Sequence, residues 1–348
     1  MNRPRVWLTI LGIAMSAAAV IVLLRAIDAA DTWRRLREAN LLWFGAACVA
    51  TVAGYLVRAI RWGELLAPVR RPPLRRLFAA TMVGFLAINT LPARLGELVR
   101  AFALSRPEGI STATVLGSVA VERVLDLVAL GIFWSLSLIV APLPGWFRWS
   151  GFATLGIAAV AAGLLWTFHR SGGGKALSID GPLLGRLPQH PRRVVGRAIP
   201  AFGEGIRAIA SPPVLARAGA WTAAMWLVNA VVFHLTAISL GLDLPIWAPF
   251  LLAFIVCVGI MVPSSPGFVG VMEGACVVGL GLMGVEGPEA LAYGVLYHAT
   301  QLLPLVALGS WYAFREHVGA EVLRGPAEMA VGRSEKSGDS DASTRYQL

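Results

Sequence analysis

Three charged residues lie within one turn of an otherwise apolar stretch. Glu122, Arg123 and Asp126 interrupt the hydrophobic run over 112–140. Charged side chains at the centre of a membrane span cost about 2.5–3.5 kcal/mol each, so they are usually paired or placed on a water-filled path. On a helix Arg123 reaches Asp126 at i+3, while Glu122 and Asp126 share a face. One arginine cannot balance two acids, so a cation from another segment is required.

Arg94 and Arg100, from an interrupted apolar segment, are the natural sources of that cation. A guanidinium group binds a carboxylate or a phosphate through two parallel hydrogen bonds. Two roles therefore stay open: these arginines close an ion-pair network, or they alternate between the acids and a lipid phosphate. Arg58 and Arg61 stand beside Trp62 at the end of a span, where we expect them to snorkel to the interface.

Two apolar stretches half a chain apart are broken in the same manner, over 89–97 and 263–273. Each break combines proline, glycine and a carboxylate. Unpaired backbone groups are costly in hydrocarbon, so such a segment survives only where it lines a cavity or is buried in protein. Paired breaks of this kind point to the substrate region of a transporter built from repeats. The candidate contacts are Asn89, Pro92, Gly96, Glu97, Ser264, Ser265, Gly267, Gly270 and Glu273.

The polar groups near the second break have several open roles. Glu273 could bind a cationic headgroup, pair with an arginine or carry a proton. Ser264 and Ser265 either satisfy freed backbone groups or contact a ligand. His234 and His298 lie in spans with no acid at ligand spacing, so we expect packed histidines and no metal site. No cofactor is expected.

Composition indicates an all-α polytopic integral membrane protein. The 348 residues are 57% hydrophobic and 14% charged. We expect about six full transmembrane helices and two interrupted, re-entrant hairpins near 77–104 and 247–284. The net charge of +10 is attributed to cytoplasmic loops and not to nucleic-acid binding. The predicted full spans are 6–26, 41–60, 112–140, 148–168, 214–240 and 289–314.

Arginine-rich segments predict the topology. Those at 58–76 and in the basic loop at about 169–213 should be cytoplasmic, and six crossings then place both termini inside. The first hairpin would open to the cytoplasm and the second to the outside, as in an inverted repeat. Arginines at 25–37 would lie outside, which counts against this topology. An amphipathic stretch at 193–210 is expected at the interface, and residues 319–348 are expected to be a disordered tail after a domain spanning 1–318.

The ordered set of motifs resembles the flippase-like transmembrane family named for lysylphosphatidylglycerol synthase. The resemblance covers about 6–318 and includes the segments 58–62, 89–100, 122–126 and 263–273. It implies a helical domain that moves modified phospholipids or polyprenyl-linked lipids between leaflets. Full-length synthases of that family carry an aminoacyl-transfer domain after this region. Here the polar segment 319–348 follows, so we expect no aminoacyl transfer.

We therefore expect a lipid flippase of the bacterial cytoplasmic membrane, not an enzyme, with an anionic or modified phospholipid or a polyprenyl-linked lipid as substrate. No nucleotide-binding motif is present, so movement would be downhill, ion-coupled or driven by the membrane potential. Two alternatives stay open: an integral-membrane transferase or hydrolase acting on a lipid-linked substrate, and an accessory subunit. The expected partners are membrane lipids and, for the accessory subunit, enzymes of lipid or glycan synthesis.

Overall fold

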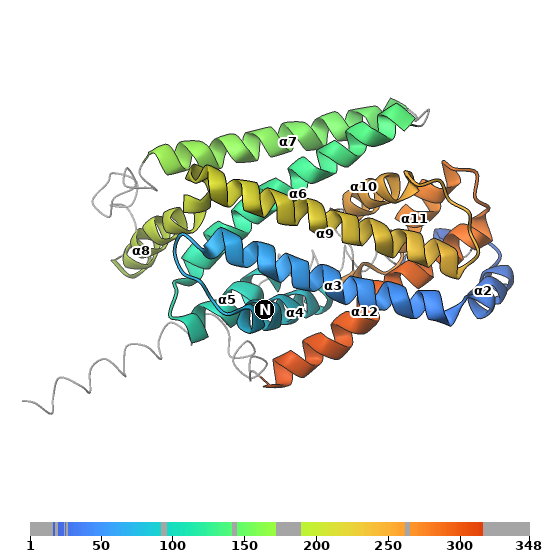
Figure 1. Cartoon of the computed structure of the whole chain (residues 1–348), viewed down its shortest axis with the longest axis horizontal. Coiled ribbons are helices and arrows are strands. Elements are labelled where there is room, and N and C mark those ends of the chain that lie inside the picture. The colour runs from blue at the N-terminus through green and yellow to red at the C-terminus, as the bar shows by residue number, and fades with distance from the viewer. Residues whose placement is uncertain are drawn as a thin grey trace, which may run out of the picture.

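The structure is a computed structural model that describes residues 27–91, 96–140, 145–171, 189–261 and 265–315, with a few residues between 17 and 25. Every regular element within these ranges is helical (Figure 1). The elements are α2 (Ala29–Glu38), α3 (Leu41–Leu66), α4 (Leu74–Thr90), α5 (Gly96–Glu108), α6 (Thr112–Val140), α7 (Gly145–Arg170), α8 (Gln189–Gly205), η4 (Ile206–Ala210), α9 (Pro212–Ser239), α10 (Ala248–Met261), η5 (Pro266–Phe268), α11 (Val271–Gly281) and α12 (Gly287–Arg315).

The long helices confirm the predicted class of fold. Among the described residues, α3, α9, α12 and the segment Trp149–Arg170 of α7 are long and apolar enough to cross a membrane. Helix α6 is as long as α12 and carries the three charged residues near its middle. These five helices match five of the predicted spans to within a few residues. The predicted span at 6–26 lies largely outside the described residues.

Both interrupted segments are hairpins. In each one, the first helix begins and the second helix ends on the same side of the molecule. At the open end of the first, Glu108 of α5 accepts from Arg76 of α4 at 2.6 Å and from Arg70 at 3.3 Å. In the second, Gly259 of α10 faces Ala275 of α11. The helices α10 and α11 of this hairpin pack antiparallel. The prediction of two hairpins is confirmed.

The halves are arranged in an inverted order. Helices α3 and α9 pack antiparallel, as the contacts Asn40 N to Ser239 O (2.7 Å) and Arg217 Nε to Glu64 Oε2 (2.8 Å) show. Each is followed by a hairpin and then a long helix, α6 or α12. The halves also exchange partners, because α4 packs on α12 and α10 packs on α6. In Figure 1 the α4–α5 hairpin lies toward one end of the molecule and α10–α11 toward the other.

The two breaks lie side by side although they are far apart in the sequence. Element η5 of the second break packs against α4, which ends at the first. A side chain at Gly267 would meet the carbonyl oxygen of Asn89 at 3.8 Å. The second break uses left-handed backbone, with φ of 78° at Gly267, 58° at Phe268 and 81° at Gly270. Glycine adopts this conformation without steric cost, which is why a tight turn fits here.

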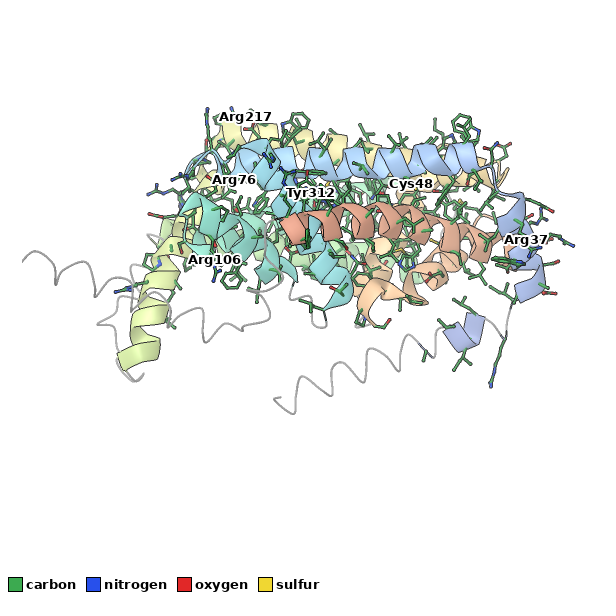
Figure 2. All side chains as sticks on the ribbon, turned by 90° about the horizontal axis from the view of Figure 1, so that it is seen from below. Arg37, Cys48, Arg76, Arg106, Arg217 and Tyr312 are labelled. Carbon is green, nitrogen blue, oxygen red and sulfur yellow. The ribbon has the colours of Figure 1, made fainter. Side chains whose placement is uncertain are left out.

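Arginines mark both ends of the bundle. Figure 2 shows Arg76, Arg106 and Arg217 at one end and Arg37 at the opposite end. The predicted amphipathic stretch forms α8 and η4 at the end where α7 finishes and α9 begins, and α8 packs on α6 through the close contact of Gly205 with Gly117. The two segments predicted to be cytoplasmic therefore share one end of the molecule.

This arrangement predicts opposite labelling of the two ends. In a chain whose three native cysteines are replaced by alanine, Arg217→Cys should react with an impermeant maleimide only after the cells are opened. Arg37→Cys should react in intact cells, because positively charged loops favour the cytoplasmic side and Arg217 belongs to the richer end. Labelling of both positions from the same side would contradict the arrangement.

Candidate functional site

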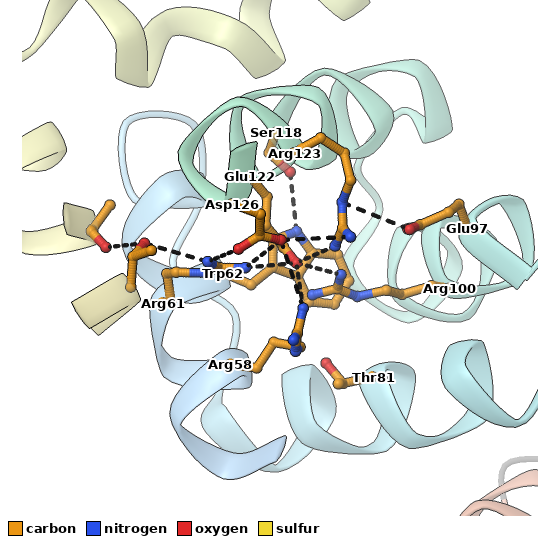
Figure 3. A network of polar contacts seen from close by, with 12 residues as sticks. Arg58, Arg61, Trp62, Thr81, Glu97, Arg100, Ser118, Glu122, Arg123 and Asp126 are labelled. Carbon is orange, nitrogen blue, oxygen red and sulfur yellow. Dashed lines mark hydrogen bonds and ion pairs between the residues drawn. The ribbon is translucent and has the colours of Figure 1, made fainter. Parts of the chain in front are cut away.

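Among the described residues, four arginines surround one carboxylate oxygen in the interior of the bundle (Figure 3). The oxygen is Oε1 of Glu122, which is fully buried. Nitrogen atoms of the four guanidinium groups lie 2.7–3.7 Å from it, with Arg123 nearest and Arg58 farthest. The arginines are Arg58, Arg61, Arg100 and Arg123, and together with Glu97, Glu122 and Asp126 they are called the arginine cluster below.

Three packed helices position the arginine cluster. Arg58 and Arg61 are one turn apart on α3, so their side chains leave the same face of that helix. Arg100 comes from α5, the returning helix of the first hairpin. Arg123 and the two acids come from α6. The cluster therefore fastens the first hairpin to the long helices on either side of it.

Asp126 supports the cluster from one turn along α6. Arg61 donates through Nη1 to Asp126 Oδ1 at 2.5 Å, and the same nitrogen lies 3.3 Å from the Thr222 hydroxyl of α9. Arg61 also reaches Glu122 through Nη2 at 3.0 Å. This fully buried guanidinium bridges both acids of α6 and contacts the opposite half of the protein.

Trp62 forms an aromatic wall on one side. The guanidinium of Arg100 lies over its ring, 3.9 Å from the centroid, and its indole nitrogen donates to the Ser118 hydroxyl at 3.0 Å. Trp62 and Arg100 are both fully buried. A cation over a desolvated ring gains about 2 kcal/mol or more, so the wall offsets part of the cost of burying Arg100.

The arginine cluster contains more positive than negative charge. Its four guanidinium groups face three carboxylates, of which Glu97 is the most distant, with Oε1 3.7 Å from Arg123 Nε. Several buried atoms also have no hydrogen-bond partner in the structure: Arg61 Nε, Arg100 Nε and Nη2, Arg123 Nε, Glu97 Oε2 and Glu122 Oε2. Because a buried donor without a partner is costly, these atoms have capacity for an additional ligand or for water.

Two arginines of the arginine cluster are open to the outside, and Glu97 beside Arg123 is partly exposed as well. The side chain of Arg123 is 41% exposed and that of Arg58 is 18% exposed, whereas Arg61 and Arg100 are sealed. Arg58 also lines a polar cavity of about 50 Å³ between α3, α9 and α12, together with Tyr55 and Asn229. At about 10–15 Å³ for each molecule, this cavity has space for a few waters. Polar access thus reaches the cluster from the α9 side.

The cluster supplies the cation that the acids of α6 require. Arg100 reaches Glu122, as the sequence suggested, and Arg58 and Arg61 join it. The expectation that Arg58 and Arg61 snorkel to the interface is wrong, since they point inward to the acids. Their spacing of three residues was the signal for this, because it aligns both side chains on one face of α3.

The first break contributes residues of different kinds. Glu97 and Arg100 enter the arginine cluster, whereas Asn89 donates through Nδ2 to the Phe85 carbonyl at 2.9 Å, one turn earlier in its own helix. Gly96 allows close packing of α5 on α4, because a side chain there would meet the backbone nitrogen of Ile88 at 2.3 Å. Pro92, Arg94 and Ser264 lie outside the described residues.

The second break forms a separate polar site. Glu273 Oε2 accepts from the Gly270 backbone nitrogen at 2.7 Å, and its Oε1 lies 2.6 Å from Nδ1 of His298. His298 was expected to be a packed histidine, and it is buried, but its pairing with Glu273 was not predicted. The partner lies 25 residues away on the preceding helix, so local spacing could not reveal it. Ser265 hydroxyl lies 3.3 Å from the Pro266 carbonyl, and Gly267 supplies the turn.

The convergence on Glu122 predicts a large loss of stability for Glu122→Gln. Removing the charge leaves the buried arginines without the carboxylate that neutralises them, and breaking a buried ion pair costs about 3–5 kcal/mol. The matched control is Glu64→Gln, which removes the partly exposed pair with Arg217 and should cost about 0–1 kcal/mol. Thermal unfolding of the purified variants in detergent compares them. Equal midpoints would contradict the central place of Glu122.

A curated relative corrects one expectation. The chain is 27% identical over 340 residues to a protein of Haloferax volcanii named glycosyltransferase AglD, and the match covers 86% of this chain and 53% of that protein. The chain thus spans about half the length of this relative. Because the relative is named as an enzyme, the expectation that this chain is not an enzyme is overturned.

The whole membrane bundle also matches a family model. The model is described as the lysylphosphatidylglycerol synthase TM region, and the match covers residues 9–309. This range includes every helix of both halves from α2 to α11 and most of α12. The match confirms the resemblance drawn from the charged and broken segments, and the chain belongs to the lysylphosphatidylglycerol synthase transmembrane family.

Proposed function

We propose that this chain binds the phosphate of a lipid headgroup at the arginine cluster and moves that lipid between the two leaflets of a membrane. The observation that carries the proposal is the excess of guanidinium groups around Glu122 inside a bundle of membrane-spanning helices. The lipid class is an anionic phospholipid or a polyprenyl phosphate, including glycan-linked forms. Each of these carries a phosphate that an arginine fork can bind.

A purely structural role would not need this composition. Each buried charge costs several kcal/mol of desolvation, and one acid with one arginine would satisfy a packing contact. Here four arginines share two acids of α6, and two of these arginines, Arg123 and Arg58, are accessible. A phosphate offers oxygen atoms to these guanidinium groups and cancels the remaining positive charge. The cluster is therefore suited to an anion that arrives and leaves.

Exposure divides the arginines into two groups. Arg123 and Arg58 are accessible and are placed to make the first contact with a headgroup. Arg61 and Arg100 are sealed and hold Glu122 and Asp126 in place. When a phosphate binds to Arg123, Glu122 stays paired with its other arginines. The buried charge of Glu122 is therefore still neutralised while lipids exchange at the site. The lipid tails would stay in the surrounding hydrocarbon.

The inverted halves support movement rather than static binding. Two hairpins that open toward opposite ends and meet at their breaks give a site that can be approached from either side. Arg100 belongs to the hairpin whose break contacts the other one. A movement of one hairpin relative to the other would therefore change which groups surround the arginine cluster.

Glycosyl transfer to or from a lipid-linked substrate is the second candidate function. The name of the Haloferax volcanii relative favours it, and a phosphate-binding cluster would serve a lipid-phosphate acceptor as well as a transported lipid. The two candidates differ in product. Transfer changes the mass of the lipid, and translocation changes only its leaflet.

The experiment follows fluorescent polyprenyl phosphate and phosphatidylglycerol in liposomes that contain the purified chain. An impermeant quencher reports the leaflet, and mass spectrometry of the extracted lipid, with a nucleotide-activated sugar present, reports transfer. We expect leaflet exchange that is at least about tenfold slower for Arg123→Gln, because the accessible fork is lost. Arg217→Gln, which removes an arginine at the end of the bundle, should match the unmodified chain.

Two outcomes would change this conclusion. A glycosylated lipid that depends on Arg123 would replace translocation by the second candidate function. Equal rates for Arg123→Gln and Arg217→Gln, with both variants folded, would remove the arginine cluster from either function.

A further inference from the structure

We propose that Glu273 and His298 form a proton-binding site at the second break, and that its occupancy is linked to the conformation of that break. The link to transport rests on the proposed function, whereas the proton site itself does not. Glu273 Oε1 and His298 Nδ1 are 2.6 Å apart, and the two residues are 8% and 6% exposed. They join α11 to α12.

The chemistry of the pair fits a single exchangeable proton. With one proton the pair is neutral overall, either as carboxylate and imidazolium or as two uncharged groups. Without it the pair carries one negative charge in a buried place, which is costly unless a cation compensates it. Only an O–H or N–H bond forms or breaks, and water supplies and accepts the proton.

The second nitrogen of His298 provides a point for exchange. Nε2 is buried and has no hydrogen-bond partner in the structure, although a neutral or charged imidazole uses both nitrogens when it can. Since buried polar atoms are nearly always satisfied, this atom is placed for a water or a proton carrier. The imidazole is therefore held by Glu273 at Nδ1, and among the described residues its Nε2 has no hydrogen-bond partner.

Glu273 also reaches the edge of the protein. It lines an apolar groove of about 290 Å³ between α2 and the helices α11 and α12, with Thr32, Trp33 and Val295 among the other lining residues. Apart from Glu273, this groove presents no charged side chain.

The nearby titratable groups on the packed elements already have other partners or lack a full charge. On α11 the neighbour is the Cys276 thiol. On α12 the hydroxyls of Tyr293 and Tyr297 bond to Phe233 O and to Asn229 of α9. On α2, Asp31 binds Arg34 and Arg35 binds Glu289, while α4 brings the uncharged Asn89 to the break. Within the described residues, His298 is the one ion-pair partner of Glu273.

Protonation acts directly on the break. The Glu273 carboxylate caps the first turn of α11 through the Gly270 nitrogen, and negative charge is favoured at a helix N-terminus. A change in its charge therefore changes the stability of the turn that contains Gly267 and Gly270. That turn contacts Asn89 of the first hairpin, whose second helix carries Arg100. The contacts connect the proton site to the arginine cluster through one packed path.

Nitrogen NMR of the full chain in nanodiscs, with ¹⁵N-labelled histidine, tests the proton site without any lipid substrate. The His298 signals are assigned by their loss in His298→Gln. We expect them to titrate between pH 5 and 9 and, in Glu273→Gln, to titrate about one pH unit lower or more, a tenfold loss of proton affinity. The exposed His234 is the internal control and should not shift in that variant. Signals of His298 that stay constant over this pH range in the unmodified chain would overturn the proposal.

Calorimetry of polyprenyl phosphate binding tests the link to transport. Heats measured in buffers of different ionisation enthalpy give the number of protons exchanged for each lipid bound. We expect a non-zero number for the unmodified chain and His234→Gln, and zero for His298→Gln. A number that is the same in all three would overturn the link. Absence of lipid binding would contradict the proposed function and the link together, while the NMR titration would still decide the proton site.

Discussion

The structure depends on the shared carboxylate of Glu122. A fully buried acid inside a bundle of membrane helices is stable only when cations meet it, and here the cations come from α3, α5 and α6. This requirement holds the first hairpin against two long helices at one point. Because the arginines exceed the acids, the same contact that assembles the bundle leaves capacity for an anion. Stability and the proposed binding of an anion therefore use the same atoms.

The inverted halves are similar in backbone and different in chemistry. Both contain a leading helix, a broken hairpin and a long closing helix, and each hairpin packs on the closing helix of the other half. The first hairpin brings Arg100 to an arginine-rich site, whereas the second brings Glu273 to a histidine. The breaks touch between Asn89 and Gly267, so neither hairpin can shift without affecting the other. In the proposed function, the inverted halves let a lipid approach from either side of the membrane. Their different residues form a site for a phosphate in the first half and a site for a proton in the second.

The sequence predicted the elements of the fold well because the bilayer constrains them strongly. Long apolar runs marked the spans, and proline with glycine marked the hairpins. The acids of α6 also required an external cation, and Arg100 was identified correctly. Contacts between distant segments were harder: the inward direction of Arg61 and the pairing of Glu273 with His298 depend on how α3, α11 and α12 pack. Local periodicity predicts which residues share a face of a helix, but not which element packs against that face.

An arginine cluster suits any lipid that carries a phosphate, so its geometry narrows the ligand chemistry without choosing between movement and group transfer. The relative named as a glycosyltransferase keeps the second candidate open, and the paired hairpins favour the first.

The most direct measurement is an experimental structure of the full chain in nanodiscs with a short-chain polyprenyl phosphate. We expect the phosphate to lie within about 3 Å of the Arg123 or Arg58 guanidinium, with Glu122 still bound by Arg61 and Arg100. A phosphate bound at another place, with all four arginines still gathered on Glu122, would show that the arginine cluster is not the lipid-binding site.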